Sequence, residues 1–359
     1  MIDADALAAL ICDWCLEVEP GQQVLVESTT LGQAPAAALH RAILERGGWP
    51  LLRLSPPGTA PDFYRHARPE QLDSFAPLEL LEAERADARV TIQAPANTTE
   101  LTGTSPELVT RATRARRALR EARLALRWCG TIWPTSALAQ QARMSERDYS
   151  EFVERALFVD RPDPTQAWRE LSARQARLVE RLSSVSEIHI ESDGTDLRLS
   201  VGGRTWINSD GRRNLPSGEV FTGPHEHSAN GTIRFDVPSD VRGAEVAGIE
   251  LTFAAGEVVG ASADRGADRL AAMLASDAGA RFLGELGIGT NTGIDRATGS
   301  TLLDEKIAGT VHLALGRSYP ETGGRNDSQL HWDLICDLRG GGRLSVDGEP
   351  LIEAGALVE

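Results

Sequence analysis

Short apolar runs alternate with amphipathic stretches along the first half of the chain. Aliphatic and β-branched residues predict strands at Gln23–Val26, Pro50–Leu54, Arg89–Gln93 and within Arg123–Trp133. Apolar residues at helical spacing predict helices at Ala4–Glu17, Ala34–Arg46 and Thr165–Leu182. Strands that alternate with helices in this way predict a mainly parallel sheet. No Gly-x-Gly-x-x-Gly follows the first strand, so the pattern does not support dinucleotide binding.

The pattern changes near Ser186 to short strands separated by Gly and Asp turns. These strands are predicted at Ile188–Ile190, Leu197–Val201, Thr232–Val237 and Glu250–Phe253. One helix is predicted among them, at about Ala267–Leu283. This half is expected to be an α+β domain on a mixed or antiparallel sheet. The whole chain is therefore predicted to be an α/β protein of two domains, residues 1–185 and 186–359.

Composition places the chain among ordinary globular proteins and narrows its partners. Of its 359 residues 41% are hydrophobic and 25% are charged, and no apolar run is long enough to span a membrane. The net charge of -15 repels phosphate backbones, which argues against nucleic acid as a partner. The acidic residues at the start, Met1–Asp5, contrast with the basic start of a signal peptide. We therefore expect a cytoplasmic protein.

The cysteines agree with that compartment. Four cysteines are too few for a disulfide scaffold in a chain of this length. Cys12 and Cys15 have the spacing of a redox motif, but they lie within an apolar helical pattern rather than after a strand. Buried thiols are the favoured interpretation, ahead of a redox or metal site.

A histidine and an aspartate share one face of the predicted strand His331–Cys336. Successive side chains of a strand point to opposite faces, so His331 and Asp333 point one way while Trp332 and Leu334 point the other. Such a pair offers nitrogen and oxygen ligands to a divalent metal. A hydrogen-bonded structural pair would have the same pattern.

A second histidine lies on the predicted strand Gly309–Gly316. His312 shares its face with Ala314 and Gly316, which leaves room beside the imidazole for an ion or a substrate. A histidine satisfied by hydrogen bonds in the core is the alternative.

Several acids occur near these histidines in sequence. Glu219 stands between a turn and an apolar run, and Glu285 lies between glycines that allow close backbone approach. Asp304 and Glu305 precede Lys306, which is the single lysine among 37 basic residues. Each acid by itself would more commonly be a solvated surface residue. Their occurrence together with the histidine strands favours a metal site.

His225 and His227 form a His-x-His pattern, which can bind metal. They lie in a segment rich in Pro, Gly and Ser, so a loop near the entrance of the site is the favoured interpretation.

This ordered set of motifs resembles the aminopeptidase T family, which comprises two-metal exopeptidases. The matching stretches are Asn214–Pro224, Phe282–Asn291, Leu303–Tyr319 and Gly323–Asp337. The resemblance covers about Ser186 to Gly348, and the first half resembles the family only in length and αβ character. It implies metal ligands at Glu219, Glu285, His312, Tyr319, His331 and Asp333.

The resemblance also implies a reaction, namely hydrolysis of the first peptide bond of a peptide with a free N-terminus. Two metals would polarise the carbonyl and activate a shared water. Glu285, Glu305, Lys306 and Tyr319 are the residues expected to take part in catalysis, with Glu285 bridging the metals and Glu305 as the alternative base. Zinc or cobalt suits the mixed ligands best, and manganese is compatible. A homodimer is expected, with residues 1–185 as the scaffold and dimerisation domain and residues 186–359 as the catalytic domain.

Lys306 admits two interpretations. Its compact ammonium would fit beside the oxygen that becomes negative in the transition state, where the wide fork of arginine would not. Alternatively, it pairs with an acid on the surface.

Two other classes of function remain open from the sequence. His312, His331 and Asp333 alone would make the iron site of a ring-cleaving dioxygenase, and some dihydroxypyridine dioxygenases look like distant relatives of this fold. A mononuclear iron site has no need of Glu219 and Glu285, so these acids argue for two metals. A noncatalytic peptide-binding protein with a relic site is the third hypothesis.

Overall fold

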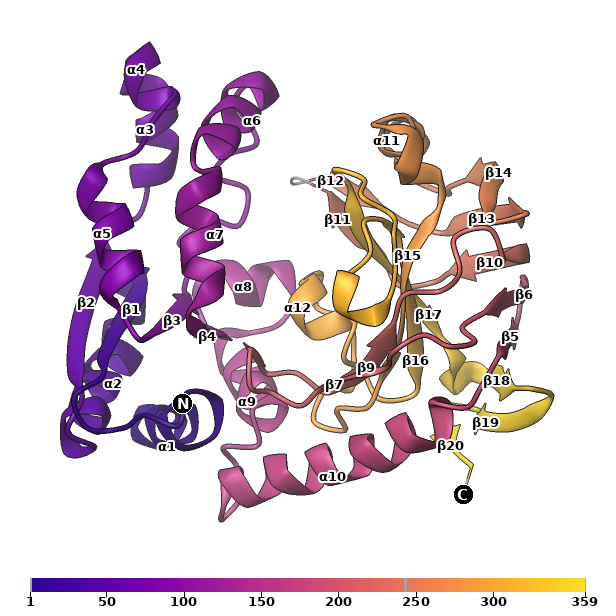
Figure 1. Ribbon diagram of the computed structural model, residues 1–359, viewed down its shortest axis with the longest axis horizontal. Helices are drawn as coiled ribbons and strands as arrows, with labels where there is room; N and C mark the ends of the chain where they lie inside the picture. Colours follow the sequence, from indigo (N-terminus) through magenta and orange to yellow (C-terminus); the bar gives the residue numbers. More distant parts are fainter. Residues whose placement is uncertain (1, 242–243, 359) are drawn as a thin grey trace. The chain divides into compact units, whose positions relative to one another are not determined.

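The computed structural model describes residues 2–241 and 244–358. It divides into two compact units, of which the first comprises Met1–Trp168 and Gly211–Pro216 and the second Arg169–Asp210 and Ser217–Glu359. Figure 1 traces most of the first in indigo to magenta and most of the second in orange to yellow.

A parallel sheet forms the centre of the first unit. Within the described residues its strand order is β2-β1-β3-β4-β8, and every neighbouring pair is parallel. Its strands are β1 (Gln23–Thr29), β2 (Trp49–Ser55), β3 (Ala88–Gln93), β4 (Arg127–Ile132) and β8 (Asn214–Leu215). The predicted parallel sheet is confirmed. Val24, Leu25 and Val26 are all buried, as expected for a parallel strand that is covered on both faces.

Helices precede and connect these strands, as the alternating pattern predicted. They are α1 (Ala4–Leu10), α2 (Gln33–Glu45), α3 (Thr59–His66), α4 (Pro69–Leu72), α5 (Pro77–Arg85), α6 (Pro106–Ala115), α7 (Arg117–Ala125), α8 (Ser136–Gln141) and α9 (Glu146–Ala156). The first predicted helix changes to a π-helical turn at Ile11–Cys15. Helix α10 (Pro164–Leu182) begins in the first unit and continues into the second, where Leu178 and Leu182 belong to the core.

All four cysteines are free and buried, which confirms the favoured interpretation. Burial raises the pKa of the Cys12 thiol to about 12, so it stays protonated and unreactive at neutral pH.

Two antiparallel sheets and a hairpin build the second unit. The wide sheet has the order β14-β13-β10-β6-β5-β18-β19-β20 among the described residues, and the site sheet has the order β17-β16-β15-β9-β7. The wide sheet consists of β5 (Glu187–Ser192), β6 (Thr195–Ser200), β10 (Asn230–Phe235), β13 (Ile249–Ala254), β14 (Glu257–Ser262), β18 (Arg343–Val346), β19 (Glu349–Glu353) and β20 (Ala356–Leu357). The site sheet consists of β7 (Ile207–Ser209), β9 (Glu219–Thr222), β15 (Leu283–Gly289), β16 (Thr310–Gly316) and β17 (His331–Asp337). The hairpin joins β11 (Ser239–Val241) to β12 (Ala244–Val246), and the helices are α11 (Ala267–Leu274) and α12 (Thr301–Asp304).

One hydrophobic core serves both sheets of the second unit. Ile188 and Leu197 contribute to it from the wide sheet, and Val311, Leu313 and Trp332 contribute from the site sheet. The alternation predicted for the two histidine strands is thereby confirmed, because their apolar positions face this core and their histidines face the other way.

The helix predicted over Ala267–Leu283 is too long. Helix α11 ends at Leu274, and Asp277 then caps a short 3-10 turn by accepting hydrogen bonds from Gly279 and Ala280. An aspartate that bonds to the backbone two and three residues ahead competes with a continuing helix. Glu285, which follows the predicted helix in the sequence, lies within strand β15.

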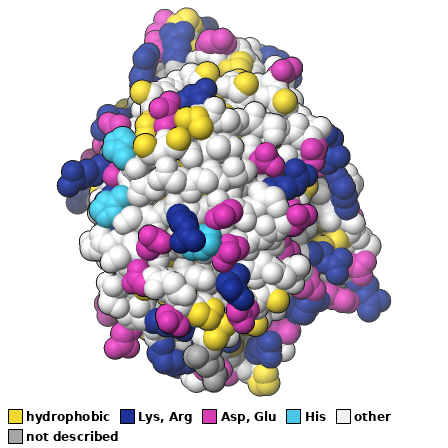
Figure 2. Space-filling model, turned by 90° about the vertical axis from the view of Figure 1, so that its right-hand side faces the viewer, with side chains coloured by type: hydrophobic (Ala, Val, Ile, Leu, Met, Phe, Trp, Pro, Cys, Tyr) yellow, Lys and Arg dark blue, Asp and Glu magenta, His cyan; other side chains and the backbone are white. Residues whose placement is uncertain are grey.

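Charged side chains of both signs are interspersed on the face of the second unit drawn in Figure 2. Exposed ion pairs include Arg198 with Glu187, on neighbouring strands of the wide sheet, and Arg234 of β10 with Asp264, which follows β14. Among the described helices, none combines the length and the apolar character that crossing a membrane would require.

Candidate metal centre

Strands β9, β15, β16 and β17 of the site sheet carry the predicted acids and histidines on one face. Ala314 of β16 pairs with Glu285 of β15 on one side and with Asp333 of β17 on the other. His331 pairs with Gly316, the next pair on this face after Ala314 and Asp333. Ala314 and Gly316 thus lie beside the longer side chains that are predicted to be ligands.

Glycine on β15 makes the space that His312 occupies. Gly287 pairs with His312, and a Cβ on Gly287 would lie 2.1 Å from atoms of the imidazole. Real Cβ atoms do not approach so closely, so any larger residue at position 287 would force the His312 ring to move. The sequence had pointed to Ala314 and Gly316 for this space, whereas the closest approach comes from the adjacent strand.

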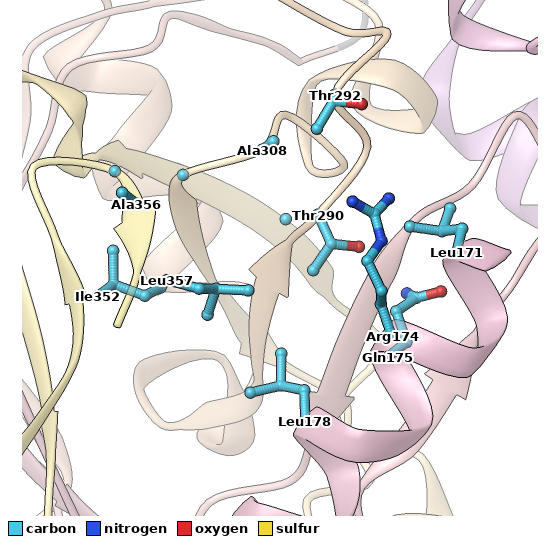
Figure 3. Close-up of a pocket in the computed structure, with 13 residues that line it drawn as sticks. Leu171, Arg174, Gln175, Leu178, Thr290, Thr292, Ala308, Ile352, Ala356 and Leu357 are labelled. Atoms are coloured by element: carbon cyan, nitrogen blue, oxygen red, sulfur yellow. The ribbon is translucent and has the colours of Figure 1, made fainter. Parts of the chain in front are cut away.

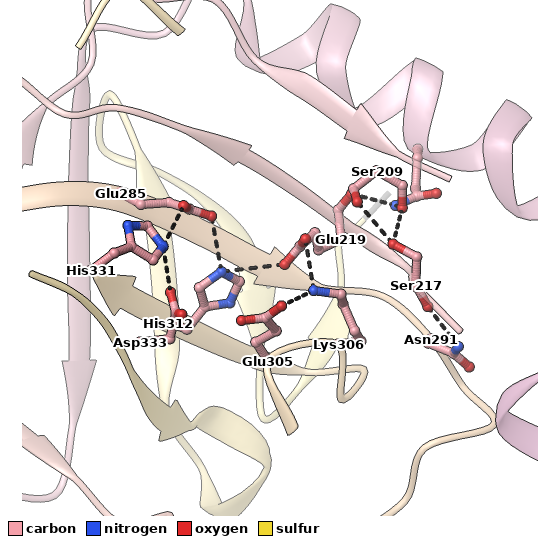
Figure 4. A network of polar contacts seen from close by, with 11 residues as sticks. Ser209, Ser217, Glu219, Glu285, Asn291, Glu305, Lys306, His312, His331 and Asp333 are labelled. Carbon is pink, nitrogen blue, oxygen red and sulfur yellow. Dashed lines mark hydrogen bonds and ion pairs between the residues drawn. The ribbon is translucent and has the colours of Figure 1, made fainter. Parts of the chain in front are cut away.

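Two histidines face the two oxygens of one carboxylate (Figure 4). His312 Nε2 lies 3.4 Å from Glu285 Oε1, and His331 Nε2 lies 3.5 Å from Glu285 Oε2. His312 Nε2 also lies 3.3 Å from Glu219 Oε2, and His331 Nε2 lies 3.5 Å from Asp333 Oδ1. Glu285 is therefore shared between a group around His312 and a group around His331.

Ligand atoms gather in three groups of the kind that can hold a metal ion. These groups are Glu219–Glu285–His312, Glu285–His331–Asp333 and Glu305–His312–Asp333, each with its atoms within 4.8 Å of one another. Among the described residues no such group contains both histidines. This separation is unlike a two-histidine, one-carboxylate iron site, in which both imidazoles bind the same ion.

Lys306 lies in the interior of this cluster. Its side chain is completely buried, and Nζ lies 2.9 Å from Glu219 Oε1 and also pairs with Glu305 Oε1. Burial by itself lowers the pKa of the ammonium, but the charges of Glu219 and Glu305 outweigh burial and raise it. The interpretation of Lys306 as a surface residue is therefore wrong. Glu219 and Glu285 are also buried, at 5% and 4% exposure, so neither is the solvated acid considered as an alternative.

Two buried polar atoms of the cluster lack hydrogen-bond partners, namely Glu219 Oε2 and His312 Nδ1. Buried polar groups are normally satisfied, so unpaired ones indicate an interaction with something else. The donor set of carboxylates and imidazoles suits a divalent cation. The residues present therefore fit the metal that the sequence predicted.

The acids of the cluster raise the pKa values of both histidines. Burial by itself lowers the pKa of His312, but hydrogen bonding to Glu285 and the charge of Glu219 raise it to about 9. Burial likewise opposes the charge on His331, whose pKa is raised to about 10 by Asp333 and Glu285. For Asp333, burial favours the neutral acid, but the hydrogen bond to His331 lowers its pKa to about 2. Metal ions would take the place of these imidazolium protons, since a ligating imidazole must be neutral.

Glu305 belongs to this cluster more closely than the sequence suggested. Burial raises its pKa to about 8, although the charge of Lys306 opposes the rise. Its position in a group with His312 and Asp333 makes it a potential ligand as well as a potential base.

Tyr319 lies at the more open side of the cluster. It is 40% exposed, and its ring lies 5.2 Å from that of His331 and 5.5 Å from that of Phe221. Burial of its hydroxyl and the charges of Glu285 and Asp333 raise its pKa. The charges of these acids therefore disfavour ionisation of the Tyr319 hydroxyl. Metal ligation by Tyr319 is still a prediction.

The remaining acids and histidines lie outside the metal groups. Asp304 is buried and accepts hydrogen bonds from Thr298 and Gly299, so it organises the loop before Glu305. His225 and His227 belong to none of the groups among the described residues. Between them, Glu226 accepts a hydrogen bond from the backbone of Arg325, in the segment that follows Tyr319.

The sequence did not indicate the residues that fix the main chain around Glu219. Gln175 donates to the main-chain carbonyl of Glu219, and Asn291 donates to the carbonyl of Ser217 just before it. Ser209 and Ser217 join hydroxyls at 2.8 Å in the same network (Figure 4). No local pattern marks these contacts. The glycines at alternate positions of β15, in contrast, do mark a cleared strand face.

Residues 3–355 match the model of a family described as thermophilic metalloprotease (M29). The chain belongs to this family. As an M29 metallopeptidase it is an enzyme that hydrolyses peptide bonds, and the predicted resemblance to the aminopeptidase T family is confirmed. The family match also covers the first half, where the sequence motifs had not reached.

Relatives of this metallopeptidase are named aminopeptidases. The chain is 32% identical to Aminopeptidase 2 of Geobacillus stearothermophilus, over 76% of each protein. It is also 32% identical to Aminopeptidase T of Thermus aquaticus, over 72% of this chain and 71% of that one.

Solved structures agree on the fold. Wild-type AmpT from Thermus thermophilus superposes with a TM-score of 0.84 at 25% identity and covers 99% of both chains. This similarity confirms the predicted α/β fold class. A 2,5-dihydroxypyridine dioxygenase from Pseudomonas putida has a TM-score of 0.60 at 15% identity, over 99% of this chain and 96% of that one. It shares the fold alone, and the dioxygenase hypothesis is not favoured.

Proposed function

We propose that this M29 metallopeptidase is an aminopeptidase that removes residues from peptides with a free N-terminus and uses two divalent cations. The observation that carries the proposal is the position of Glu285, whose two oxygens face His312 on one side and His331 on the other. A carboxylate shared between two ligand groups suits a pair of cations held close together, as in two-metal hydrolases.

One cation would be held by Glu219, Glu285 and His312, and the other by Glu285, His331 and Asp333. Tyr319 would complete the second group. The mixed nitrogen and oxygen ligands suit zinc or cobalt, and manganese is compatible with them. When bound, such cations polarise a carbonyl and lower the pKa of water to near neutrality.

Lys306 orients Glu219 toward the cluster. Its ammonium pairs with Oε1 of Glu219, while Oε2 faces His312 Nε2 at 3.3 Å without a hydrogen bond and is available as a ligand. The same ammonium is the one lysine side chain available to stabilise an oxygen that becomes negative in the transition state.

Glu305 is the candidate for moving a proton from the nucleophile to the leaving amine. Both oxygens of Glu285 face histidines, whereas Glu305 is tethered through one oxygen to Lys306. A tethered carboxylate beside the ligand cluster can accept a proton and return it within one catalytic cycle.

The direction of approach follows from burial. His312 and Lys306 are completely buried, whereas the His331 side chain is 25% exposed and Tyr319 is 40% exposed. The N-terminus of a peptide would therefore approach past Tyr319 and His331.

Substrate specificity tests the exopeptidase assignment. A leucyl chromogenic amide with a free amine should be hydrolysed, whereas its N-acetyl form should react at least a hundredfold more slowly. Acetylation removes the amine lone pair that a cation would bind, and it adds bulk. Comparable rates on both substrates would contradict the aminopeptidase assignment and indicate an endopeptidase or amidase.

Metal content tests the two-cation assignment. Elemental analysis of enzyme purified without chelator should approach two equivalents per chain, and Glu285→Gln should lose metal while the fold is retained. Glu257→Gln, at an exposed position of β14, is the matched control and should keep both equivalents. One tightly bound iron, with no second metal on titration, would contradict the proposal.

The assignment of residues 1–185 to scaffold and dimerisation, and of residues 186–359 to catalysis, is likewise a proposal. So is the homodimer. The supporting observation is that all the ligands in the three groups belong to the second unit.

A further inference from the structure

A cavity separate from the metal centre opens in the second unit. Its volume is about 250 Å³, and it lies among α10, the end of β15 and strands β19 and β20 (Figure 3). Its apolar wall consists of Leu171, Leu178, Ala308, Ile352, Ala356 and Leu357. None of the residues in the three metal groups lines it. An apolar cavity of about 150 Å³ already holds benzene, so this one has room for a small organic molecule.

An unpaired cation stands at this cavity. Arg174 is exposed on α10 and makes no hydrogen bond or ion pair with any described residue. Figure 3 shows its guanidinium beside Thr290, whose hydroxyl is turned toward it. The Thr290 hydroxyl is itself buried without a hydrogen-bond partner. A guanidinium in this setting favours a carboxylate ligand, which it can bind through two parallel hydrogen bonds.

A residue with an unpaired acceptor lines the same cavity. Gln175 is 1% exposed, and its amide nitrogen donates to the carbonyls of Glu219 and Ser209. These two carbonyls fix the orientation of the amide, because an amide oxygen in that place would face two other oxygens. Gln175 Oε1 is thereby left buried without a partner, and it needs a donor such as an ammonium.

We propose that this cavity binds a free aliphatic α-amino acid. The carboxylate would pair with Arg174, the ammonium would donate to Gln175 Oε1 and Thr290, and the side chain would lie against Leu171 and Leu178. The volume is below the roughly 300–1,000 Å³ of sites for drug-sized ligands, which matches a single residue better than a peptide. An aliphatic amino acid would also be the released product, a point that rests on the proposed function.

The cavity communicates with the metal centre through one side chain. Gln175 lines the cavity and also donates to the main-chain carbonyl of Glu219, a predicted metal ligand. A ligand that bonds to the Gln175 amide would therefore contact a residue that is itself hydrogen-bonded to Glu219, a member of the metal groups.

Calorimetric titration with L-leucine tests the proposal on metal-loaded enzyme and on chelator-treated enzyme. Leucine should bind both forms, because the cavity needs no metal. Arg174→Gln should weaken this binding at least tenfold, while Arg177→Gln, an exposed position on the same helix outside the cavity, should leave it unchanged. Leucinamide, which lacks the carboxylate, should bind the chelated enzyme at least tenfold more weakly than leucine.

Three results would overturn the proposal. Leucine binding that disappears entirely on chelation would assign it to the metal centre. Equal losses in Arg174→Gln and Arg177→Gln would indicate nonspecific attraction to the helix. A change in sedimentation of Arg174→Gln without a change in leucine binding would make the cavity part of a contact between copies. Hydrolysis of the leucyl amide by the same preparations separates these results from failure of the proposed function, since binding can persist in a protein that does not cleave it.

Discussion

Lys306 is the exception in a chain whose other basic residues are all arginine. It is the one lysine among 37 basic residues, and it is completely buried between two carboxylates. A surface cation could be arginine as readily as lysine, whereas a narrow interior position admits a compact ammonium more readily than a planar fork. The burial therefore supplies a physical reason for the exception.

Lys306→Arg should lower kcat at least tenfold while metal content stays near that of the wild type. The wider planar head group would keep the charge but cannot take the position of the compact ammonium beside the reacting oxygen, and a lost transition-state donor costs about 10²–10³ in kcat. Steady-state kinetics and elemental analysis of the same sample measure both quantities. Arg198→Lys, which exchanges the cation of an exposed ion pair, is the control for the substitution itself and should leave kcat unchanged. Near-normal kcat in Lys306→Arg would show that the shape of the cation is irrelevant.

The acids illustrate how far single residues can be interpreted. Glu219 and Glu285 could be selected as candidates because each borders an apolar run or glycines. Their burial could not be predicted, since a glutamate is normally exposed. Burying its charge costs free energy unless partners compensate it. The ammonium and imidazoles that compensate them come from other strands and loops.

At the scale of elements, the close pairing of β15 with β16 decides whether the ligands meet. The alternation along β16 and β17 was predicted correctly because the period of a strand is local. The position of β15 beside β16 is a matter of strand order, which no local period contains. The incorrect helix over Ala267–Leu283 concealed this strand, and the aspartate cap at Asp277 is the local feature that ends the helix.

Gly287→Ala should weaken metal binding at least tenfold with a smaller effect on folding. A methyl group there would lie 2.1 Å from the His312 ring, so the imidazole must move away from Glu219 and Glu285. Competition with a chelator gives the metal affinity, and thermal unfolding reports the fold. Gly340→Ala is the matched control, because nothing lies within 4 Å of a Cβ at that position. An unchanged affinity in Gly287→Ala would mean that His312 does not hold metal.

At the scale of the whole molecule, the titratable groups of the candidate metal centre couple stability to pH. The pKa values of His312 and His331 are raised to about 9 and about 10 from 6.5, and that of Glu305 is raised to about 8 from 4.5. A raised pKa means that the folded state holds the proton more tightly than the unfolded state. The contribution to stability is then complete below the unfolded pKa and is lost as pH rises through the folded pKa.

The metal-free enzyme should therefore lose stability between about pH 6 and pH 10. Metal binding needs neutral imidazoles, so stabilisation by added metal should grow over the same interval. The difference in Tm between loaded and chelated enzyme should widen by about 5 °C or more. His331→Gln should reduce this widening, while His189→Gln on the wide sheet should preserve it. A constant difference in Tm across this interval would contradict the replacement of protons by metal.

The sequence by itself determined the alternating first half, the faces of the two histidine strands and the set of candidate ligands. Each of these follows from local periodicity or from the identity of a side chain. Periodicity and side-chain identity do not depend on residues far away in the sequence. Tertiary structure decided the rest. The sharing of Glu285 between His312 and His331, the burial of Lys306 and the space made by Gly287 all arise where separate strands and loops meet. Pairing, burial and close approach are relations between residues far apart in the chain, so they come into existence only when the sheet assembles.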